Sequence, residues 1–273
     1  MNFTLSDDQQ QIRDAVLKLA SRFGDDYWLA RDSDGVFPEE FCRALADDGW
    51  IGIAVPEAYG GSGLGVTEAA LVVQAISESG AGNSGVSAVA VGFFGLNPLI
   101  EFGTDEQRRE WLPRIIRRED IACFGVTEPG TGHDTTRLKT RAERDGDNYI
   151  IHGEKVWIST AQVANKIMLI ARTTPIEQCA KPSDGLSLFY ADLDRRYVDI
   201  RVIDKMGRKC VDSNEVFFDG LPVSRDQLIG EEGKGFRYLL HGLNAERVLI
   251  AAISPPLLLS FLAERVLGLP KSY

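Results

Sequence analysis

Two ionisable residues stand side by side in an apolar segment, HGLNAERVLIAA, at residues 241 to 252. A helical ion pair needs an opposite charge three or four residues away, and neither Glu246 nor Arg247 has one at those positions. We therefore expect neither charge to be satisfied within its own helix, so that each meets another element, a ligand or a partner chain. A carboxylate flanked by leucine and isoleucine loses solvent, which raises its pKa and makes it a better base near neutral pH.

A glycine-rich segment, FGVTEPGTGHD at residues 124 to 134, follows an apolar run with the character of a strand. Its glycines permit close approach to a flat or phosphorylated ligand, and the Thr127 hydroxyl and free backbone amides can hydrogen-bond such a ligand. A simple turn at the end of a strand explains the same residues, and it stays an alternative at this stage. The G-x-G-x-x-G pattern of dinucleotide-binding folds is missing.

A third segment, KVWIST at residues 155 to 160, places Trp157 and Ser159 on one face of a strand by its period of two. An indole and a hydroxyl on one face can pack against a ring system and hydrogen-bond it, whereas a half-buried core tryptophan is the alternative. The later GEEGKGF segment lacks the spacing of a phosphate-binding loop, which favours a tight turn that enters a helix.

Composition excludes several classes of protein. The 273 residues carry a formal net charge of −10 with acids and bases interspersed, so no basic stripe is present to bind a nucleic acid. The four cysteines and three histidines show no metal-binding spacing, which predicts reduced, mostly buried thiols and no metal site. The apolar stretch near residues 248 to 262 contains two prolines and is too short to cross a bilayer.

The first residues, MNFTLSDDQQQIRD, have neither the pattern of a signal peptide nor that of a transit peptide. We expect a cytoplasmic chain, or one whose presequence is gone, and a mitochondrial or peroxisomal location stays open.

Helical patterns dominate the first part of the chain. Ser6 and Gln9 form the signature of a capping box before an amphipathic helix, and Thr104 with Gln107 forms another. Pro38 suits the first turn of a helix, and Thr67 is predicted to cap TEAALVVQAISES.

From about Asp120 the runs become short and rich in β-branched residues, with turn signals such as Asp145-Gly146, which predicts a β domain. Helical spacing resumes after GEEGKG, with one predicted apolar face that comprises Phe236, Leu239, Leu240, Leu243, Arg247 and Ile250. The order indicates an α+β fold with an all-α domain at 1–119, a β-sandwich or barrel-like domain at 120–230 and an incomplete C-terminal helical domain at 231–273.

Together these segments resemble the acyl-CoA dehydrogenase family over roughly residues 3 to 252. GVTEPGTGHDTTRLKTRAERDGDNYIIHGEKVWIS looks like the family's T-E-P-G-x-G-S-D segment and the K-x-W-I-T strand that follows it. DKMGRKCVDSNEVFFDG through IGEEGKGF is similar to its later strands and return to helix, and VPEAYGGSGLG and FGTDEQRREWLPRI are similar to its N-terminal helical region.

The resemblance implies an FAD-dependent α,β-dehydrogenation of an acyl-CoA thioester to a 2-enoyl-CoA. Trp157 would cover the flavin, and Ser159, where the family usually has threonine, would hydrogen-bond the flavin N5 region. The implied cofactor-binding set is Phe124, Gly125, Val126, Thr127, Trp157, Ile158 and Ser159.

Other positions match the family's substrate site. The x-x-E-R pattern is that of the branch that includes isovaleryl-CoA and long-chain enzymes, and it places Glu246 at the catalytic base, with Asn244 and Arg247 among the substrate contacts. His133 replaces a serine tied to the CoA portion of the substrate. The implied electron acceptor is an electron-transferring flavoprotein or similar protein, and the implied assembly is a homodimer or homotetramer.

Family members continue into a C-terminal helical bundle, whereas this sequence reads ISPPLLLSFLAERVLGLPKSY, so we expect a C-terminally shortened form. Pro255-Pro256 should interrupt the helix beyond Ile253. AERVL at 263–267 is a candidate remnant of a family element, with Leu269 in place of an arginine that reaches the FAD phosphates. The alternative function is a non-catalytic or partner-dependent subunit, and a related flavin monooxygenase is disfavoured by the retained Glu246.

Overall fold

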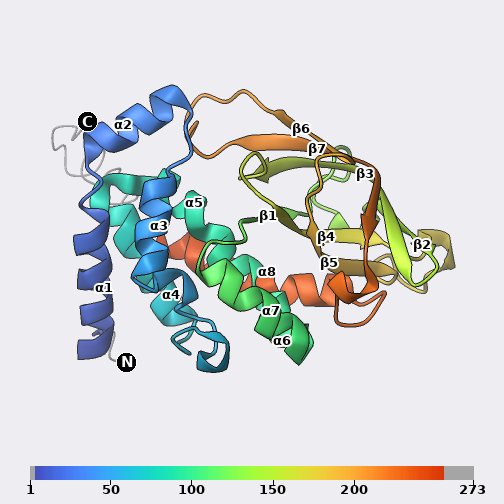
Figure 1. Ribbon diagram of the computed structural model, residues 1–273, viewed down its shortest axis with the longest axis horizontal. Helices are drawn as coiled ribbons and strands as arrows, with labels where there is room; N and C mark the ends of the chain where they lie inside the picture. Colours follow the sequence, from blue (N-terminus) through green and yellow to red (C-terminus); the bar gives the residue numbers. More distant parts are fainter. Residues whose placement is uncertain (1–3, 255–273) are drawn as a thin grey trace.

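The structure is a computed structural model and describes residues 4 to 254. The expectations for Pro255-Pro256, residues 263–267 and Leu269 lie outside these residues. Helices form one side of the molecule and strands the other (Figure 1). The α-helices are α1 (Asp7–Ala20), α2 (Asp25–Asp34), α3 (Glu39–Asp47), α4 (Val66–Ile76), α5 (Gly82–Ala90), α6 (Asn97–Phe102), α7 (Asp105–Ile116) and α8 (Gly235–Ala252).

Shorter helical turns connect several of these helices, and a set of strands follows them. The turns are η1 (Trp50–Gly52), η2 (Glu57–Tyr59), η3 (Ser77–Ala81), η4 (Val91–Gly95), η5 (Thr135–Arg137), η6 (Ile176–Gln178) and η7 (Arg225–Gln227). The strands are β1 (Ala122–Gly125), β2 (Arg141–Asp145), β3 (Asn148–Ser159), β4 (Lys166–Arg172), β5 (Leu186–Asp192), β6 (Val198–Val202), β7 (Ser213–Val223) and β8 (Leu228–Ile229).

Side-chain caps fix where two of the helices begin, as the sequence predicts. The Gln9 N–H donates to Ser6 Oγ at 3.2 Å and the Ser6 N–H to Gln9 Oε1 at 3.1 Å, and Thr104 and Gln107 repeat this exchange at α7. The predicted cap at Thr67 is wrong. Helix α4 begins at Val66 after Gly65, whose N–H donates to the Glu68 carboxylate at 3.0 Å, so Thr67 lies inside the first turn.

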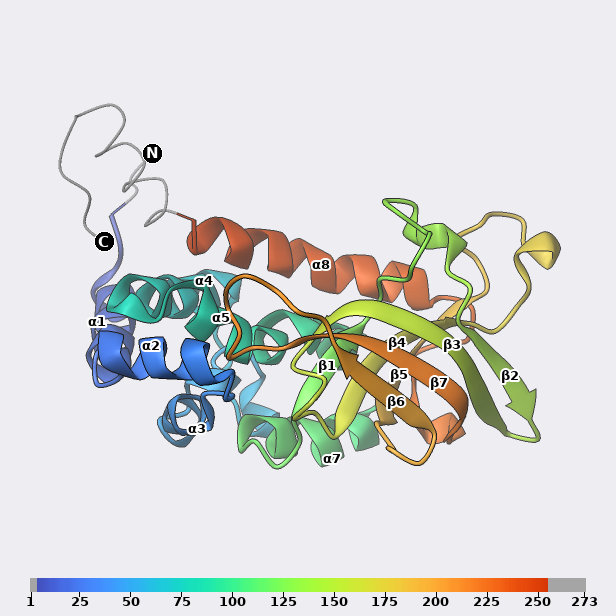
Figure 2. The same cartoon turned by 90° about the horizontal axis from the view of Figure 1, so that it is seen from above.

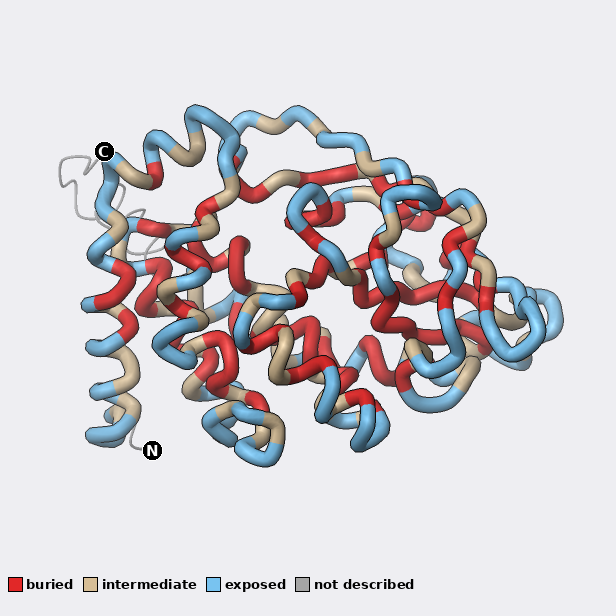
Figure 3. Tube along the Cα trace, viewed as in Figure 1, coloured by how far each residue is buried: buried red, intermediate tan, exposed pale blue. Residues whose placement is uncertain are grey.

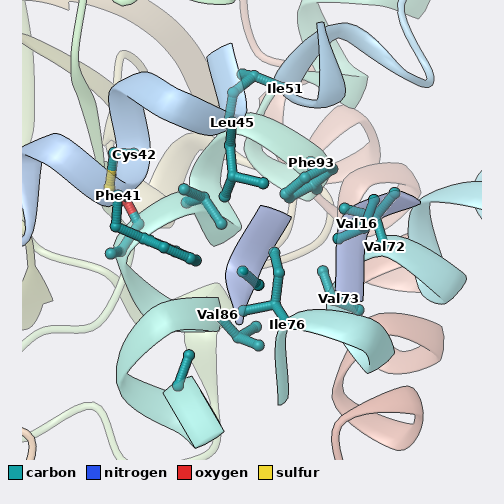
Figure 4. Packing of buried hydrophobic residues seen from close by; sticks show 14 of the residues in the cluster. Val16, Phe41, Cys42, Leu45, Ile51, Val72, Val73, Ile76, Val86 and Phe93 are labelled. Atoms are coloured by element: carbon teal, nitrogen blue, oxygen red, sulfur yellow. Dashed lines mark hydrogen bonds between the residues drawn. The ribbon is translucent and has the colours of Figure 1, made fainter. Parts of the chain in front are cut away.

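A buried cluster of apolar side chains holds the helices α1, α3, α4 and α5 together (Figure 4). Val16, Phe41, Leu45, Val72 and Ile76 are each fully buried within it. Burial of one such side chain contributes about 1.5 to 3 kcal/mol relative to an exposed one, so this cluster is the main source of cohesion in the helical layer.

The helical run from Val66 to Phe102 is the one stretch among residues 4 to 254 with the length and apolar composition to cross a membrane. Of its most apolar stretch of 18 residues, 56% is buried inside the molecule. Packing in the helical core therefore accounts for its composition, because a core helix of a globular domain can be as long and as apolar as a membrane-spanning helix.

Within the described residues the strands form one mixed eight-stranded sheet, with the order β6-β7-β3-β2-β4-β5-β8 and β1 paired with β4. The predicted turn at Asp145-Gly146 joins β2 and β3 in a hairpin, in which Gly146 takes the positive φ of 61° that glycine tolerates. Strands β6 and β8 were not predicted, because their short segments mix apolar with charged or turn-forming residues.

The sheet curls around a core of its own, to which β1 through β7 contribute. Ile151 of β3, Leu169 of β4, Phe189 of β5 and Val216 of β7 are all fully buried in this cluster. The predicted α+β class, with a helical part followed by a barrel-like sheet, is confirmed.

A third apolar cluster joins the helices to the strands. Buried stretches of chain occur in both the helical part and the sheet (Figure 3). The ring centroids of Trp111 and Tyr190 lie 5.0 Å apart, and Phe102 stacks on Tyr238 of α8 at 4.3 Å. A Cβ at Gly235 would approach the Leu188 backbone N to 2.5 Å, so glycine lets the first turn of α8 rest directly on β5. From there α8 runs back along the helices (Figure 2).

The face that α8 buries differs from the predicted one. Gly235, Tyr238, Leu239, Gly242 and Leu249 are buried, whereas Leu240, Arg247 and Ile250 are exposed. The prediction counted only large side chains, but close approach of α8 to its neighbours selects two glycines. A Cβ at Gly242, for example, would approach the Pro98 side chain to 3.1 Å.

Polar contacts also connect the two parts of the chain. The Gln107 amide donates to the backbone oxygens of Asp226 at 2.6 Å and Leu228 at 2.8 Å. The fully buried Asp120 carboxylate accepts two bonds from Arg114, both at 2.9 Å, and one from Asn165 at 3.0 Å. Burial alone would raise the Asp120 pKa, but these bonds outweigh it and lower that pKa.

Replacement of Asp120 by alanine should lower the free energy of unfolding by about 1 to 3 kcal/mol, because a buried acceptor of three hydrogen bonds is removed. The matched control is Asp199→Ala, whose side chain is 57% exposed and pairs with Arg201. It should cost no more than about 0.5 kcal/mol. Urea denaturation of both variants measures these losses, and equal losses would contradict a role for Asp120 as an anchor.

Candidate active site

Most of the predicted site residues line one cavity of about 410 Å³ between the sheet and α8. Of the predicted cofactor set, the cavity contains Phe124, Val126, Thr127, Trp157, Ile158 and Ser159, and the predicted base Glu246 lines it as well. Segments more than a hundred residues apart in the sequence therefore meet at one place.

The first wall comes from β1 and the loop that follows it. Phe124 lines the cavity and packs edge-on against Phe94 of η4, with ring centroids 5.3 Å apart. Gly125 is not among the lining residues. A Cβ there would approach the Ile167 side chain to 2.8 Å, so its α-carbon faces the sheet core and glycine is needed for packing.

The second wall comes from the end of β3, where the strand is irregular. Between Lys155 and Ile158 the register with β7 shifts, because three steps along β3 match two steps along β7. This β-bulge gives Trp157 a positive φ of 64° and leaves its side chain 61% exposed, while Ile158 is buried. Trp157 and Ser159 do line the same cavity, but the bulge rather than a regular period of two brings them there.

These two walls fit a flat ring with hydrogen-bonding edges. An exposed indole is available for stacking, and among the described residues the Thr127 and Ser159 hydroxyls form no side-chain hydrogen bond. The core-tryptophan alternative for Trp157 is wrong, since a tryptophan packed in the core would not be mostly exposed.

Glu246 enters the cavity from α8 beside Leu243 and Ile250. Its side chain is half-buried and, within residues 4 to 254, has no hydrogen-bond or ion-pair partner. Burial raises the Glu246 pKa above its ordinary value, and the neighbouring Arg247 charge opposes that rise only in part. Arg247 likewise has no carboxylate ion-pair partner within residues 4 to 254, and its guanidinium donates one hydrogen bond to the neutral amide of Asn244, at 2.5 Å from Oδ1.

The structure does not bring the three predicted substrate contacts into this cavity. His133 is exposed in the segment between β1 and η5, and Arg247 is exposed on α8. Asn244 lines a second cavity of about 450 Å³ on another side of α8, together with His241 and Leu249. Their roles in substrate binding stay predictions.

A buried ion pair that the sequence did not suggest fixes the two walls to each other. Lys155 Nζ donates to Glu128 Oε1 at 2.8 Å and to the backbone oxygen of Val126 at 3.1 Å, with the Lys155 side chain fully buried. The backbone N–H groups of Lys139 and Thr140 donate to the same carboxylate at 2.6 and 3.0 Å. Both residues belong to the two motifs, and an acid in one motif with a base in the other was the signal available.

Burial acts on both ends of this pair. It lowers the pKa of Lys155 to about 8, against the attraction of Glu128. Burial alone would raise the pKa of Glu128, but the Lys155 ammonium and the Lys139 N–H outweigh it and lower that pKa. Both groups are therefore charged at neutral pH, and each depends on the other for compensation.

A second unpredicted residue, Arg208, lines the cavity from the segment between β6 and β7. Its guanidinium donates to the Ser87 hydroxyl at 2.8 Å.

Within the described residues, no group of three or more histidine, cysteine or acidic side chains is placed to hold a metal ion. Cys42, Cys123 and Cys210 are free and buried, as predicted for most of the thiols, and Cys179 is free and partly exposed.

Two sequence profiles of one enzyme family match this chain. The N-terminal domain of acyl-CoA dehydrogenases matches residues 6–119, and their middle domain matches residues 123–221. The chain belongs to the acyl-CoA dehydrogenase family. Its members are flavoprotein oxidoreductases that act on acyl-CoA compounds.

Individual relatives agree with this assignment. A probable acyl-CoA dehydrogenase of Bacillus subtilis is 33% identical over 93% of this chain and 66% of its own length. The mitochondrial isovaleryl-CoA dehydrogenase of Pongo abelii is 32% identical over 90% of this chain and 58% of its own. An acyl-CoA dehydrogenase structure from Geobacillus kaustophilus superposes with a TM-score of 0.86 at 29% identity, over 93% of this chain and 66% of that one. This chain thus spans less than two thirds of the relatives it matches.

Replacement of Lys155 by methionine should lower the free energy of unfolding by about 3 to 5 kcal/mol, because it leaves the Glu128 charge buried without its partner. The double variant Glu128→Gln/Lys155→Met should be more stable than the single variant. Glutamine removes the charge while its amide oxygen still accepts from the N–H groups of Lys139 and Thr140. Urea denaturation compares the two, and a double variant no more stable than Lys155→Met would contradict the charge argument.

Proposed function

We propose that this chain carries the site of an FAD-dependent α,β-dehydrogenation, which converts an acyl-CoA thioester to a 2-enoyl-CoA. The observation that supports the proposal best is the single cavity lined by an exposed indole, by the Thr127 and Ser159 hydroxyls and by the Glu246 carboxylate. Within residues 4 to 254 none of these three oxygen-bearing side chains has a hydrogen-bond partner. Such a dehydrogenation needs a base on one side of the acyl chain and a hydride acceptor on the other.

FAD would be held by the walls formed by β1 and β3. Phe124 and Val126 offer apolar contact, Trp157 a stacking surface, and Thr127 and Ser159 hydroxyls to hydrogen-bond the polar edge of the ring. When bound, FAD supplies the acceptor for the hydride that leaves the β-carbon. Ile158 and Gly125 support this wall from the sheet side.

Glu246 would remove the α-proton of the thioester. The ionised carboxylate is the active form, and its raised pKa makes it a stronger acceptor of that proton than an exposed glutamate. Leu243 and Ile250 of α8 border the same cavity and reduce access of water to the base.

The remaining partners follow from the family and are part of the proposal. We assign His133 to the CoA portion of the substrate, and Asn244 with Arg247 to contacts outside the cavity, where their mutual hydrogen bond holds them. The electron acceptor would be an electron-transferring flavoprotein or similar protein, and the assembly a homo-oligomer. The alternative is a non-catalytic or partner-dependent subunit with the same two domains.

The test of the proposal begins with the colour of the purified protein. It should contain FAD and bleach when an acyl-CoA is added, whereas colourless protein that takes up no FAD would favour the non-catalytic alternative.

Glu246→Gln should retain FAD, but its rate of flavin reduction should fall by about a hundredfold or more, because the base is neutralised. Glu143→Gln, which removes an exposed carboxylate on β2, is the matched control, and unchanged reduction in Glu246→Gln would disprove the assignment of the base.

The rate of flavin reduction should depend on pH through Glu246. Only the ionised carboxylate takes up a proton, so the rate should fall as the pH drops through the Glu246 pKa, which burial places above the ordinary value of 4.5. Stopped-flow measurement of the reductive step across the acid range gives the midpoint of this limb. A midpoint at or below 4.5 would show that the base is not desolvated.

A further inference from the structure

Arg208 places a positive charge in a cavity whose lining is mostly apolar. Among the described residues that line it, Arg208 is the one basic side chain and Glu246 the one acidic side chain. Arg208 is half-buried and adopts a positive φ of 56°, a strained backbone conformation for a residue with a long side chain. Strain of this kind persists where the surroundings hold a residue in place, and it is concentrated at ligand sites.

The Arg208 charge has no carboxylate partner within residues 4 to 254. Its one side-chain hydrogen bond in that part of the chain goes to the neutral hydroxyl of Ser87, so most of the donors of the guanidinium are not used by side chains. The nearby Lys205 is also basic. Burial lowers the Lys205 pKa, and the like charge of Arg208 lowers it further.

Residues of α5 and of η4 form the part of the cavity lining that lies next to this charge. Ser87 and Ala90 of α5 line the cavity at helical spacing, and Val91 and Phe94 of η4 continue the row. The row is apolar until it reaches Ser87, where the Arg208 guanidinium is tethered. An acyl chain laid along this row would meet alkyl and aromatic groups first and a cation at the end.

We propose that Arg208, positioned by Ser87, selects acyl thioesters whose acyl chain ends in a carboxylate. This inference rests on the proposed function, because it takes the cavity to be the acyl site. A guanidinium binds a carboxylate through two parallel hydrogen bonds, and an alkyl end would instead bury the charge without a partner. The phosphates of FAD or CoA are other anions, but several phosphate charges call for more than the single basic side chain that the described residues contribute to this lining.

Glutaryl-CoA and valeryl-CoA form a matched pair of probes, with acyl chains of equal length that differ in the terminal carboxylate. Isothermal titration of the full-length chain should show tighter binding of glutaryl-CoA, and Arg208→Gln should weaken that binding by about tenfold to a hundredfold. Valeryl-CoA affinity and FAD content should stay unchanged in this variant. Arg237→Gln, which removes an exposed charge from α8 outside the cavity, should leave both affinities unaltered.

Arg208→Lys keeps the charge but not the paired donors, and it should retain an intermediate preference for glutaryl-CoA, which guards against a folding defect in the glutamine variant. An equal affinity for both thioesters in the unaltered chain, or equal weakening of both in Arg208→Gln, would overturn the inference. Loss of FAD in Arg208→Gln would overturn it in favour of a phosphate contact.

The two proposals fail in different ways. If valeryl-CoA bleaches the flavin but glutaryl-CoA binds no better, the selection by Arg208 is wrong and the dehydrogenation stands. If neither thioester bleaches the flavin but the preference for glutaryl-CoA exists and depends on Arg208, the binding inference stands and the redox proposal falls. If neither thioester binds, both proposals fall.

Discussion

The buried ion pair between Glu128 and Lys155 is the constraint on which the site depends. It connects the loop after β1 to the middle of β3, and the backbone oxygen of Val126 shares the same ammonium. Besides this ion pair, the two walls share a backbone hydrogen bond, in which the Val156 N–H donates to the Thr127 oxygen at 2.9 Å, and apolar contacts that tolerate sliding. A charge pair with bonds from two backbone N–H groups has a single good geometry, which is how a fold made largely of apolar contacts positions two segments accurately.

Much of the fold was predictable from the sequence because local rules decided it. The capping boxes at Ser6 and Thr104 and the hairpin at Gly146 depend on residues a few positions apart, and the structure shows all three. The predicted cap at Thr67 failed since Gly65 and Glu68 together satisfy the same end of the helix. The prediction of the buried face of α8 was wrong because it rested on large apolar residues. The helix lies closest to its neighbours at glycines, which a search for apolar periodicity does not mark as buried.

The site was predictable where a motif carried it and not where tertiary contacts created it. Phe124, Trp157, Ser159 and Glu246 were found because their segments resemble a known family, and the structure brings them to one cavity. Arg208 could not be found in this way, since its position depends on a turn that approaches α5 across 121 residues of sequence. The exposure of Trp157 could not be predicted either, because a regular alternation of side chains gives no sign of an extra residue inserted in the strand.

The bulge beside Trp157 makes the site sensitive to the length of β3 as well as to its side chains. Tyr149, Ile151 and Lys155 point inward at odd positions of the strand, and after the bulge Ile158 takes the inward place. Deletion of Val156 would restore a regular ladder in which Ile158 still faces inward opposite Asn214, but it would remove the bulge that gives Trp157 its positive φ. Such a shortened strand would keep the indole and the Ser159 hydroxyl but change how they are placed, so the site constrains the length of this strand as well as its side chains.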